Sequence, residues 1–241
     1  LGLKTAPYRA VDTRQDLSEA VDALGLPAIL KTRRFGYDGK GQARLSTQED
    51  QAPAIADMAG QAAILEGFIS FSKEVSIIGA RNSAGDVACF DPGENIHQAG
   101  ILRTTSVPAQ INATQRMDAV LLAAKIMNAL DYVGVMGVEL FVTGQGLIVN
   151  EIAPRVHNSG HWTQNGCAVD QFEQHIRAIA NWPLADGSRH SNVTMTNLIG
   201  DDLNALEALS SQAGTALHLY GKAEIKPGRK MGHYNSVRSK S

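Results

Sequence analysis

Residues 132–153 read YVGVMGVELFVTGQGLIVNEIA, and this stretch decides the fold that the sequence predicts. Two strongly apolar runs, Tyr132–Thr143 and Leu147–Ile152, are separated by Gly144-Gln145-Gly146. Apolar runs joined by a few residues that include glycine are typical of an antiparallel β-hairpin. The hairpin is therefore the starting point for assigning the segments around it.

The register of this hairpin determines which of its acidic side chains meet. With a three-residue connection, Thr143 pairs with Leu147, and Glu139 lies directly opposite Glu151 with Cβ atoms roughly 5 Å apart. Two bare carboxylates there repel each other, so a bridging dication is favoured, and Mg²⁺ commonly uses one or two carboxylates plus substrate phosphates. With a two-residue connection, Glu139 faces Asn150, whose amide oxygen suits the same metal. The remaining alternative is two glutamates on a hydrated sheet face.

Periodicity and capping signals outline further helices and strands around the hairpin. Helices are predicted over residues 13–24, 47–60, 114–130 and 170–181 and after Asp201, and strands over 27–31, 62–69, 74–79, 192–200 and 216–220. The first 80 residues thus resemble a small α+β unit, and a second unit follows.

Composition excludes several classes of protein. The chain has 241 residues, of which 44% are hydrophobic and 19% charged, as is ordinary for a globular protein. Its formal net charge of −2 does not indicate non-specific nucleic-acid binding. No apolar run reaches the roughly 18 residues of a membrane span, and residues 1–20 contain no signal-peptide core. Cys89 and Cys167 match no zinc or redox spacing, so a reducing, cytoplasmic setting is expected.

A glycine-rich segment, GYDGKG at residues 36–41, follows the apolar strand that ends at Lys31. Glycines let backbone N–H groups approach a phosphate, although this segment lacks the Gly-Lys-Ser/Thr of a P-loop. A lysine that closes a strand just before such a loop is placed to reach phosphate oxygens. The alternatives are a glycine-rich hairpin turn and a solvated lysine.

Two further glutamates occur in predicted strands. Glu66 lies within AAILEGFI, where a carboxylate is costly unless its charge has a partner. The backbone of residues 66–69 is suited to an adenine edge, and Glu74 to ribose hydroxyls. Alternatively, both glutamates are exposed members of alternating strands.

Dense polar chemistry follows directly after Glu151, in APRVHNSGHWTQNG. Arg155 is suited to stabilising a transferring phosphoryl group. His157 and His161 do not read as a zinc pair, because Pro154 and Gly160 disfavour a helix and no glutamate follows the first histidine. No nucleophile set of a hydrolase is visible.

A cationic cluster lies near the end of the chain. It comprises Lys222, Lys226, Arg229 and Lys230. The turn at Pro227-Gly228 suits a phosphorylated substrate, although a charge run is more often a solvated face. The isolated histidines are more often structural than catalytic; they are His97, His175, His190, His218 and His233.

Taken in order, these motifs resemble the ATP-grasp superfamily and, within it, the N5-carboxyaminoimidazole ribonucleotide synthetase family. NEIAPRVHNSGHWTQNG at 150–166 and PGRKMGH at 227–233 are specific to that family. The resemblance implies an α+β, ATP-grasp fold, with a small lid subdomain at 1–80 and a large metal-binding subdomain at 81–185 holding ATP between them. It also implies a small β-rich unit at 186–241 and an N-terminal α/β domain before residue 1.

The resemblance implies an ATP-dependent carbon–nitrogen ligase of purine biosynthesis. ATP converts bicarbonate to carboxyphosphate, and the exocyclic amine of 5-aminoimidazole ribonucleotide captures the carboxyl unit, with ADP and phosphate as the other products. ATP and Mg²⁺ are the implied cofactors, and a homodimer is expected without nucleic-acid or membrane partners. The alternatives are a related ligase, such as a formate-dependent glycinamide ribonucleotide transformylase or a biotin-carboxylase-like subunit, and a non-catalytic nucleotide-binding module.

The resemblance also assigns site residues, carried over position by position. The implied ATP-binding residues are Lys31, Gly36, Tyr37, Asp38, Gly39, Lys40, Gly41, Gln42, Glu66, Gly67, Phe68, Ile69, Glu74, His97, Asn150 and Glu151. The implied metal ligands are Glu139 and Glu151. The implied substrate-binding residues are Tyr37, Asp38, Asn158, Ser159, Lys222 and Arg229. Asp38, as base on the amine, and Arg155, facing bicarbonate and the transferred phosphoryl group, are the implied catalytic residues.

Overall fold

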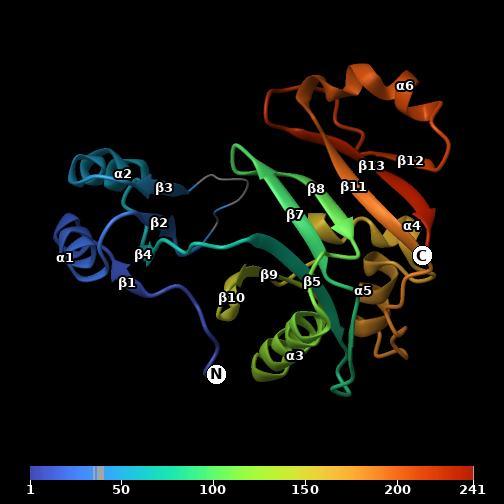
Figure 1. Cartoon of the computed structure of the whole chain (residues 1–241), viewed down its shortest axis with the longest axis horizontal. Helices are drawn as coiled ribbons and strands as arrows, with labels where there is room; N and C mark the ends of the chain where they lie inside the picture. Colours follow the sequence, from blue (N-terminus) through green and yellow to red (C-terminus); the bar gives the residue numbers. More distant parts are fainter. Residues whose placement is uncertain (35, 37–40, 241) are drawn as a thin grey trace. The chain divides into compact units, whose positions relative to one another are not determined.

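The computed structural model describes residues 1–34, 36 and 41–240, which form two compact units (Figure 1). The smaller unit comprises Lys4–Phe71 with Ala99–Ile101, and the larger comprises the other described residues. Four residues of the expected glycine loop lie outside the described residues; they are Tyr37, Asp38, Gly39 and Lys40.

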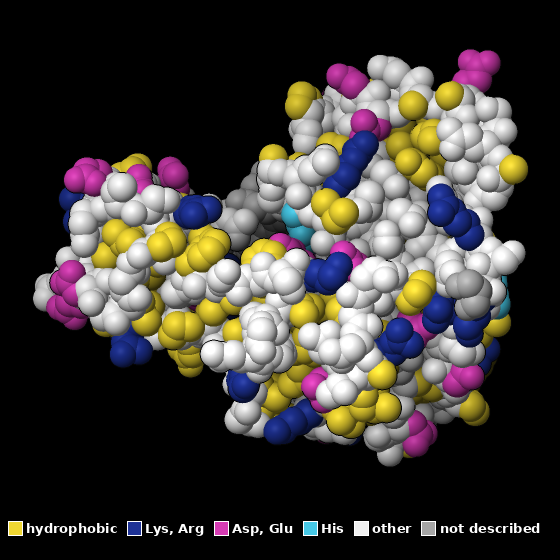
Figure 2. Space-filling view, viewed as in Figure 1, with side chains coloured by type: hydrophobic (Ala, Val, Ile, Leu, Met, Phe, Trp, Pro, Cys, Tyr) yellow, Lys and Arg dark blue, Asp and Glu magenta, His cyan; other side chains and the backbone are white. Residues whose placement is uncertain are grey.

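The surface carries charges of both signs. Figure 2 shows Lys and Arg side chains interspersed with Asp and Glu across the face in view, in keeping with the net charge of −2. Within the described part of the chain, no helix has the length and apolar character needed to cross a membrane.

The smaller unit is an antiparallel sheet with strand order β1-β4-β2-β3. Its elements are β1 (Tyr8–Val11), α1 (Arg14–Leu24), β2 (Ala28–Thr32), β3 (Gln42–Leu45), the 3₁₀ turn η1 (Gln48–Asp50), α2 (Gln51–Asp57) and β4 (Ala63–Gly67). Helix α1 begins at a capping box, in which Thr13 and Asp16 cap each other's backbone N–H groups. Buried Leu17, Leu30 and Leu65 hold the helices against the sheet.

The larger unit is built on a sheet with strand order β10-β9-β5-β7-β8-β11-β13-β12, with β6 pairing to β5. Its strands are β5 (Lys73–Arg81), β6 (Val87–Cys89), β7 (Gly93–Gln98), β8 (Ile101–Val107), β9 (Gly134–Thr143), β10 (Gly146–Ala153), β11 (Ser191–Ile199), β12 (Thr215–Leu219) and β13 (Lys230–Ser239). Its helices and 3₁₀ turns are α3 (Ala113–Ala129), η2 (Asn158–Gly160), α4 (Thr163–Gly166), α5 (Gln171–Ile179), η3 (Gly200–Ala205) and α6 (Leu206–Ser210). The predicted α+β class is confirmed.

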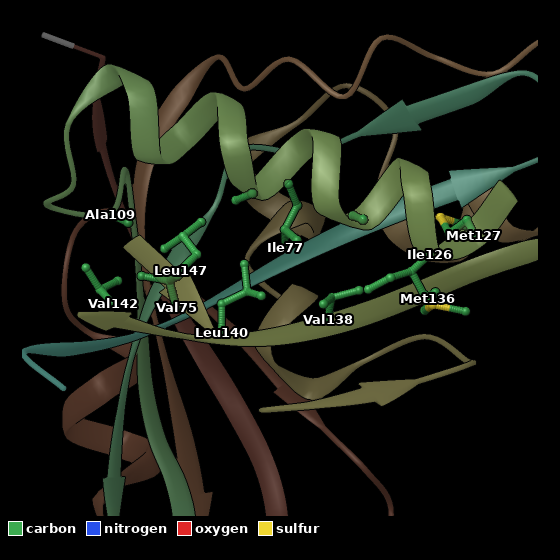
Figure 3. Close-up of a cluster of buried hydrophobic side chains, with 12 residues drawn as sticks. Val75, Ile77, Ala109, Ile126, Met127, Met136, Val138, Leu140, Val142 and Leu147 are labelled. Carbon is green, nitrogen blue, oxygen red and sulfur yellow. The ribbon is translucent and has the colours of Figure 1, made fainter. Parts of the chain in front are cut away.

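Side chains alternate between the two faces of the sheet along β5 and β9, so the two faces differ in character. On one face, Val75 and Ile77 of β5 and Val138 and Leu140 of β9 are buried beneath α3, as Figure 3 shows. At one end of the opposite face, Ile78 packs in a second apolar cluster that includes Trp162. Toward the other end of that face, the side chains change to Glu74, Ser76 and Glu139. The sheet therefore presents a polar patch over a rigid apolar base.

Two expected boundaries differ from those observed. β5 pairs with β9 from Lys73 to Arg81, so residues 72–80 belong to the larger unit and the boundary falls after Phe71 rather than at residue 80. β11 and β13 continue the large sheet, so the predicted C-terminal subdomain at 186–241 lies within the larger unit. β13 itself was not predicted, because its polar residues indicated a solvated tail. Pairing to β11 and β12 on its two sides satisfies its backbone and buries Met231 and Asn235.

Candidate active site

The β9–β10 hairpin places Glu139 directly opposite Glu151. Its connection has two residues, since pairing begins at Gly146 and Thr143, and a regular ladder from there sets Glu139 against Asn150. A β-bulge at Asn150 shifts the register by one residue and returns Glu151 to that position. The expected three-residue connection is therefore wrong, whereas the acidic pair that it predicted is confirmed.

The two carboxylates disturb each other. The Glu139 side chain is only 14% exposed. Burial, and then the negative charge of Glu151, raise the pKa of Glu139 to about 7, while His97 and Lys230 oppose the shift. A cation shared by the two side chains would remove this repulsion, so the pair favours binding of a positive charge.

The donor set fits a hard dication that also binds a nucleotide. Across residues 1–34, 36 and 41–240, no group of three or more His, Cys, Asp and Glu side chains is arranged to hold a metal. Two carboxylates on neighbouring strands leave most of an octahedral shell to water and phosphate oxygens, as is usual for Mg²⁺. Glu139 and Glu151 are thus the residues that would hold it.

A second acidic group lies on the same sheet face. Glu74 of β5 is two residues from Ser76, which pairs directly with Glu139. The Glu74 carboxylate lies 2.7 Å from Nδ1 of His97 on β7. Burial disfavours the charged imidazole, but the hydrogen bond and charge of Glu74 outweigh it and raise the pKa of His97. The two expected nucleotide-side residues are therefore brought together as a polar pair.

The chain after β10 brings His157 onto this face. Its Nε2 lies 3.5 Å from the Glu139 carboxylate, and its Nδ1 lies 2.8 Å from Oγ of Ser159. The Ser159 hydroxyl in turn lies 2.7 Å from that of Ser76. Burial, and then the charge of Arg155, lower the pKa of His157 to about 3, so its ring is neutral. Sequence reasoning assigned no role to His157 or Ser76, although the spacing of Ser76 from Glu74 along β5 was a usable signal.

Gly137 makes the approach of His157 feasible. A Cβ at Gly137 would lie 2.8 Å from Cβ of His157 and 2.9 Å from its Cγ. We expect Gly137→Ala to lower the free energy of unfolding by about 1–3 kcal/mol, because the His157 side chain must shift to make room for the added methyl group. Urea unfolding measures this change. Gly144→Ala is the matched control, since a Cβ there meets nothing within 4 Å, and equal losses in the two variants contradict the packing argument.

Three other predicted residues follow the hairpin. Arg155 is exposed, and its Nη1 donates to the carbonyl of Val156. Asn158 exchanges two side-chain hydrogen bonds with Asn197, of 2.9 and 2.7 Å. Ser159 is only 1% exposed, so its hydroxyl serves the buried network rather than an open surface.

The residues of the cationic cluster lie in the turn before β13 and at the start of that strand. Arg229 donates to the carbonyl of Glu224 at 3.1 Å, and the Lys222 ammonium lies 5.6 Å from the centre of the Tyr220 ring. Lys230, the first residue of β13, lowers the pKa of both Glu139 and His157. The sequence indicated Lys230 only as part of a charge run, and β13 is what turns it toward the acidic face.

In the smaller unit, the strand lysine finds an acidic partner. Lys31 on β2 lies 2.7 Å from the Glu66 carboxylate on β4, and their side chains are 21% and 19% exposed. Gln42 pairs with Lys31 across β2 and β3, and Arg44 lies over the exposed Phe68 ring. The expected residues of this unit are thus clustered, and Lys31 is not simply a solvated strand end.

Comparisons with known proteins place this geometry in a family. The ATP-grasp domain family matches residues 1–172, and the phosphoribosylaminoimidazole carboxylase C-terminal domain family matches residues 193–241. The N5-carboxyaminoimidazole ribonucleotide synthase of Brucella melitensis biotype 1 is 52% identical over 243 residues, which cover 100% of this chain and 67% of that protein. This chain belongs to the N5-carboxyaminoimidazole ribonucleotide synthase family of ATP-grasp proteins.

Other members of the synthase family agree. The enzyme of Escherichia coli K12 is 47% identical over 98% of this chain and 65% of its own length. An ADP complex of an N5-carboxyaminoimidazole ribonucleotide synthetase has a TM-score of 0.93 at 42% identity, over 98% of this chain and 63% of that one. The Aspergillus clavatus synthase with ADP and 5-aminoimidazole ribonucleotide has a TM-score of 0.91 at 30% identity, over 99% of this chain and 65% of that one. The chain thus spans about two thirds of the length of these synthases.

Proposed function

We propose that this chain is the nucleotide- and metal-binding part of an ATP-dependent ligase that carboxylates 5-aminoimidazole ribonucleotide on its exocyclic amine. The observation that carries the proposal is the Glu139–Glu151 pair, set by a bulge on a rigid apolar sheet. Family membership and the relative solved with ADP and 5-aminoimidazole ribonucleotide support it. Bicarbonate as carboxyl source, Mg²⁺, a cytoplasmic location and a homodimer belong to the same proposal.

The proposed reaction has two transfers. A bicarbonate oxygen attacks the γ-phosphorus of ATP, ADP leaves, and carboxyphosphate forms. The amine nitrogen of the ribonucleotide then bonds to the carboxyl carbon, directly or as released CO₂, while phosphate leaves and a base takes the amine proton. Catalysis of the first step requires positioning and charge neutralisation more than covalent chemistry.

The residues divide these tasks. Glu139 and Glu151 would hold Mg²⁺, which, when bound, neutralises phosphate charge. Lys31 is proposed to bind phosphate oxygens, the backbone of residues 66–69 the adenine edge, and Glu74 the ribose hydroxyls. Arg155 is proposed to face the transferred phosphoryl group. Asp38 remains the proposed base on the amine, and it lies outside the described residues.

The residues beneath the polar patch are buried. Ser76 and Ser159 are 2% and 1% exposed, and His157 is neutral and 8% exposed. Charges next to such buried groups interact more strongly than they do in water, because few solvent dipoles screen them. The buried groups therefore strengthen the interaction of neighbouring charges with a phosphoryl group.

ADP release by the purified chain tests the proposal. Bicarbonate with 5-aminoimidazole ribonucleotide is expected to stimulate ADP release, and formate with glycinamide ribonucleotide is not. Carbon-13 from labelled bicarbonate should appear bonded to the amine nitrogen. Stimulation by formate instead supports the related transformylase, and ATP binding without turnover in either mixture supports a non-catalytic nucleotide-binding module.

Arg229→Ala tests the proposed site for the substrate phosphate. We expect the KM for 5-aminoimidazole ribonucleotide to rise at least about tenfold, because charge-assisted hydrogen bonds contribute roughly 1.5–3 kcal/mol, while the KM for ATP stays within about twofold. Steady-state kinetics with each substrate varied in turn provide the comparison. Lys226→Ala removes a cation of the same turn that is paired with Glu224, and it serves as the control. Equal increases in both KM values count against Arg229 as a substrate ligand.

A further inference from the structure

Gln171 is a buried polar residue that has been given no task so far. It is the first residue of α5, and its side chain is completely shielded from solvent. A buried amide destabilises the fold unless its donors and acceptor find partners. Gln171 meets this requirement through one segment of the chain, the residues that follow the acidic hairpin.

Both ends of the Gln171 amide hold the backbone of His157. Its Oε1 accepts from the His157 N–H at 2.9 Å, and its Nε2 donates to the His157 carbonyl at 2.8 Å. Because a carbonyl can only accept, the orientation of the amide is determined. The second Nε2 proton then points to Nδ1 of His161, at 2.9 Å, which leaves the proton of that neutral ring on its Nε2.

The residues between His157 and Gln171 pack closely around the Gln171 amide. A Cβ on Gly160 would lie 2.5 Å from Oε1 of Gln171, so only glycine leaves room for the amide. Thr163 Oγ1 accepts from the Gln171 N–H at 3.1 Å and donates to the Gly160 carbonyl at 2.6 Å. Gln171 thus fixes residues 157–163 as one rigid segment.

The segment held by Gln171 carries the side chain that contacts the metal-ligand candidate Glu139. His157 and Ser159 both belong to it, and the imidazole lies between the Ser159 hydroxyl and the Glu139 carboxylate. A carboxylate that binds a metal is oriented by hydrogen-bonding neighbours, and loss of such neighbours weakens metal binding. We propose that Gln171 is a positioning residue of the active site, which acts through His157 to orient Glu139 for a divalent cation. This inference rests on the proposed function.

The same helix offers a matched control. Gln174 is equally buried, and its amide also bridges one residue, accepting from the Ala185 N–H at 3.1 Å and donating to the Ala185 carbonyl at 2.8 Å. It holds a segment that carries none of the site residues. Gln171→Met and Gln174→Met each keep the side-chain volume and leave one backbone donor and one backbone acceptor without their amide partner.

The experiment measures Mn²⁺ binding in the presence of ADP by electron paramagnetic resonance, together with urea unfolding of each variant. Gln171→Met is expected to lose at least as much stability as Gln174→Met, because it also loses the hydrogen bond to Nδ1 of His161. Only Gln171→Met is expected to raise the dissociation constant for Mn²⁺, by about 10–100-fold. Nitrogen NMR of the imidazole rings should show a changed His157 environment in that variant and an unchanged one in Gln174→Met. If Gln171→Met does not fold, Gln171→Glu replaces it, since it keeps the acceptor and removes both donors.

The outcomes separate this inference from the function on which it rests. If the unaltered chain binds no Mn²⁺ with ADP, the proposed function fails and the inference fails with it. If the unaltered chain binds Mn²⁺ and the Gln171 and Gln174 variants weaken it equally, only the positioning role is overturned.

Discussion

Replacing Glu151 by Gln is expected to lower ATP turnover by about 10²–10³-fold, a loss on the scale of removing one preorganised electrostatic group from an active site. The substitution keeps size and shape but removes half of the charge that would hold the cation opposite Glu139. Turnover should recover partly at high Mg²⁺ concentration, because weakened binding is opposed by mass action. Initial rates of ADP release across a Mg²⁺ series measure both effects.

The stability of Glu151→Gln should not fall with its activity. Like charges directly opposite each other on paired strands are destabilising, so Glu151→Gln should leave the free energy of unfolding in metal-free buffer unchanged or raise it by up to about 1 kcal/mol. Glu173→Gln removes a surface carboxylate that pairs with Arg177, and it should leave turnover intact. Undiminished turnover in Glu151→Gln would exclude this residue as a metal ligand.

Loss of stability in mild acid is the second large effect expected. His161, His233 and His218 form a stacked column, with ring centres 4.7 and 4.6 Å apart. Burial, and then neighbouring basic side chains, lower the pKa of His161 to about 4 and the pKa of His233 to about 3, and the pKa of His157 on the polar patch is lowered to about 3. These rings are neutral in the folded chain and become protonated in the unfolded chain near pH 6.5.

The sign of the effect follows from proton uptake. Below pH 6.5 these histidines bind protons in the unfolded chain but stay neutral in the folded chain. The free energy of unfolding therefore falls as the pH falls, until the folded pKa values are reached. Each ring contributes about 1.4 kcal/mol per pH unit. Glu139 offsets the contribution of one ring to this loss, because its raised pKa makes the folded chain take up a proton as the pH falls from 7 toward 4.5. The net loss is then about 3 kcal/mol per pH unit, a large share of the roughly 5–15 kcal/mol of a typical protein.

Urea unfolding at a series of pH values between neutral and mildly acidic tests this expectation. His233→Gln should make the slope of the unfolding free energy against pH shallower by the equivalent of about one proton, because one histidine that stays neutral in the folded chain has been removed. His190→Gln, at an exposed position, is the control variant. A slope in His233→Gln equal to that of the unaltered chain contradicts the role given to this ring.

The sequence by itself determined the features that depend on near neighbours. The helix predicted over residues 13–24 matches α1, because the hydrogen bond from the Asp16 N–H to the Thr13 side chain spans only three residues. The apolar runs over residues 132–143 and 147–152, joined by a glycine-containing connection, predicted the β9–β10 hairpin that the structure shows. The acidic pair was also foreseen, but through a turn length that was wrong, because no local signal marks the bulge at Asn150.

Only the tertiary structure decided which distant residues complete the site. Ser76 and Ser159, in hydrogen-bonding contact, are 83 residues apart in sequence, and Gln171 holds His157 across 14 residues. Lys230 reaches the acidic face because β13 is paired on both sides, although its own sequence indicates a solvated tail. Periodicity reports the bonds that a segment makes within itself, whereas these contacts depend on the fold that brings separate segments together.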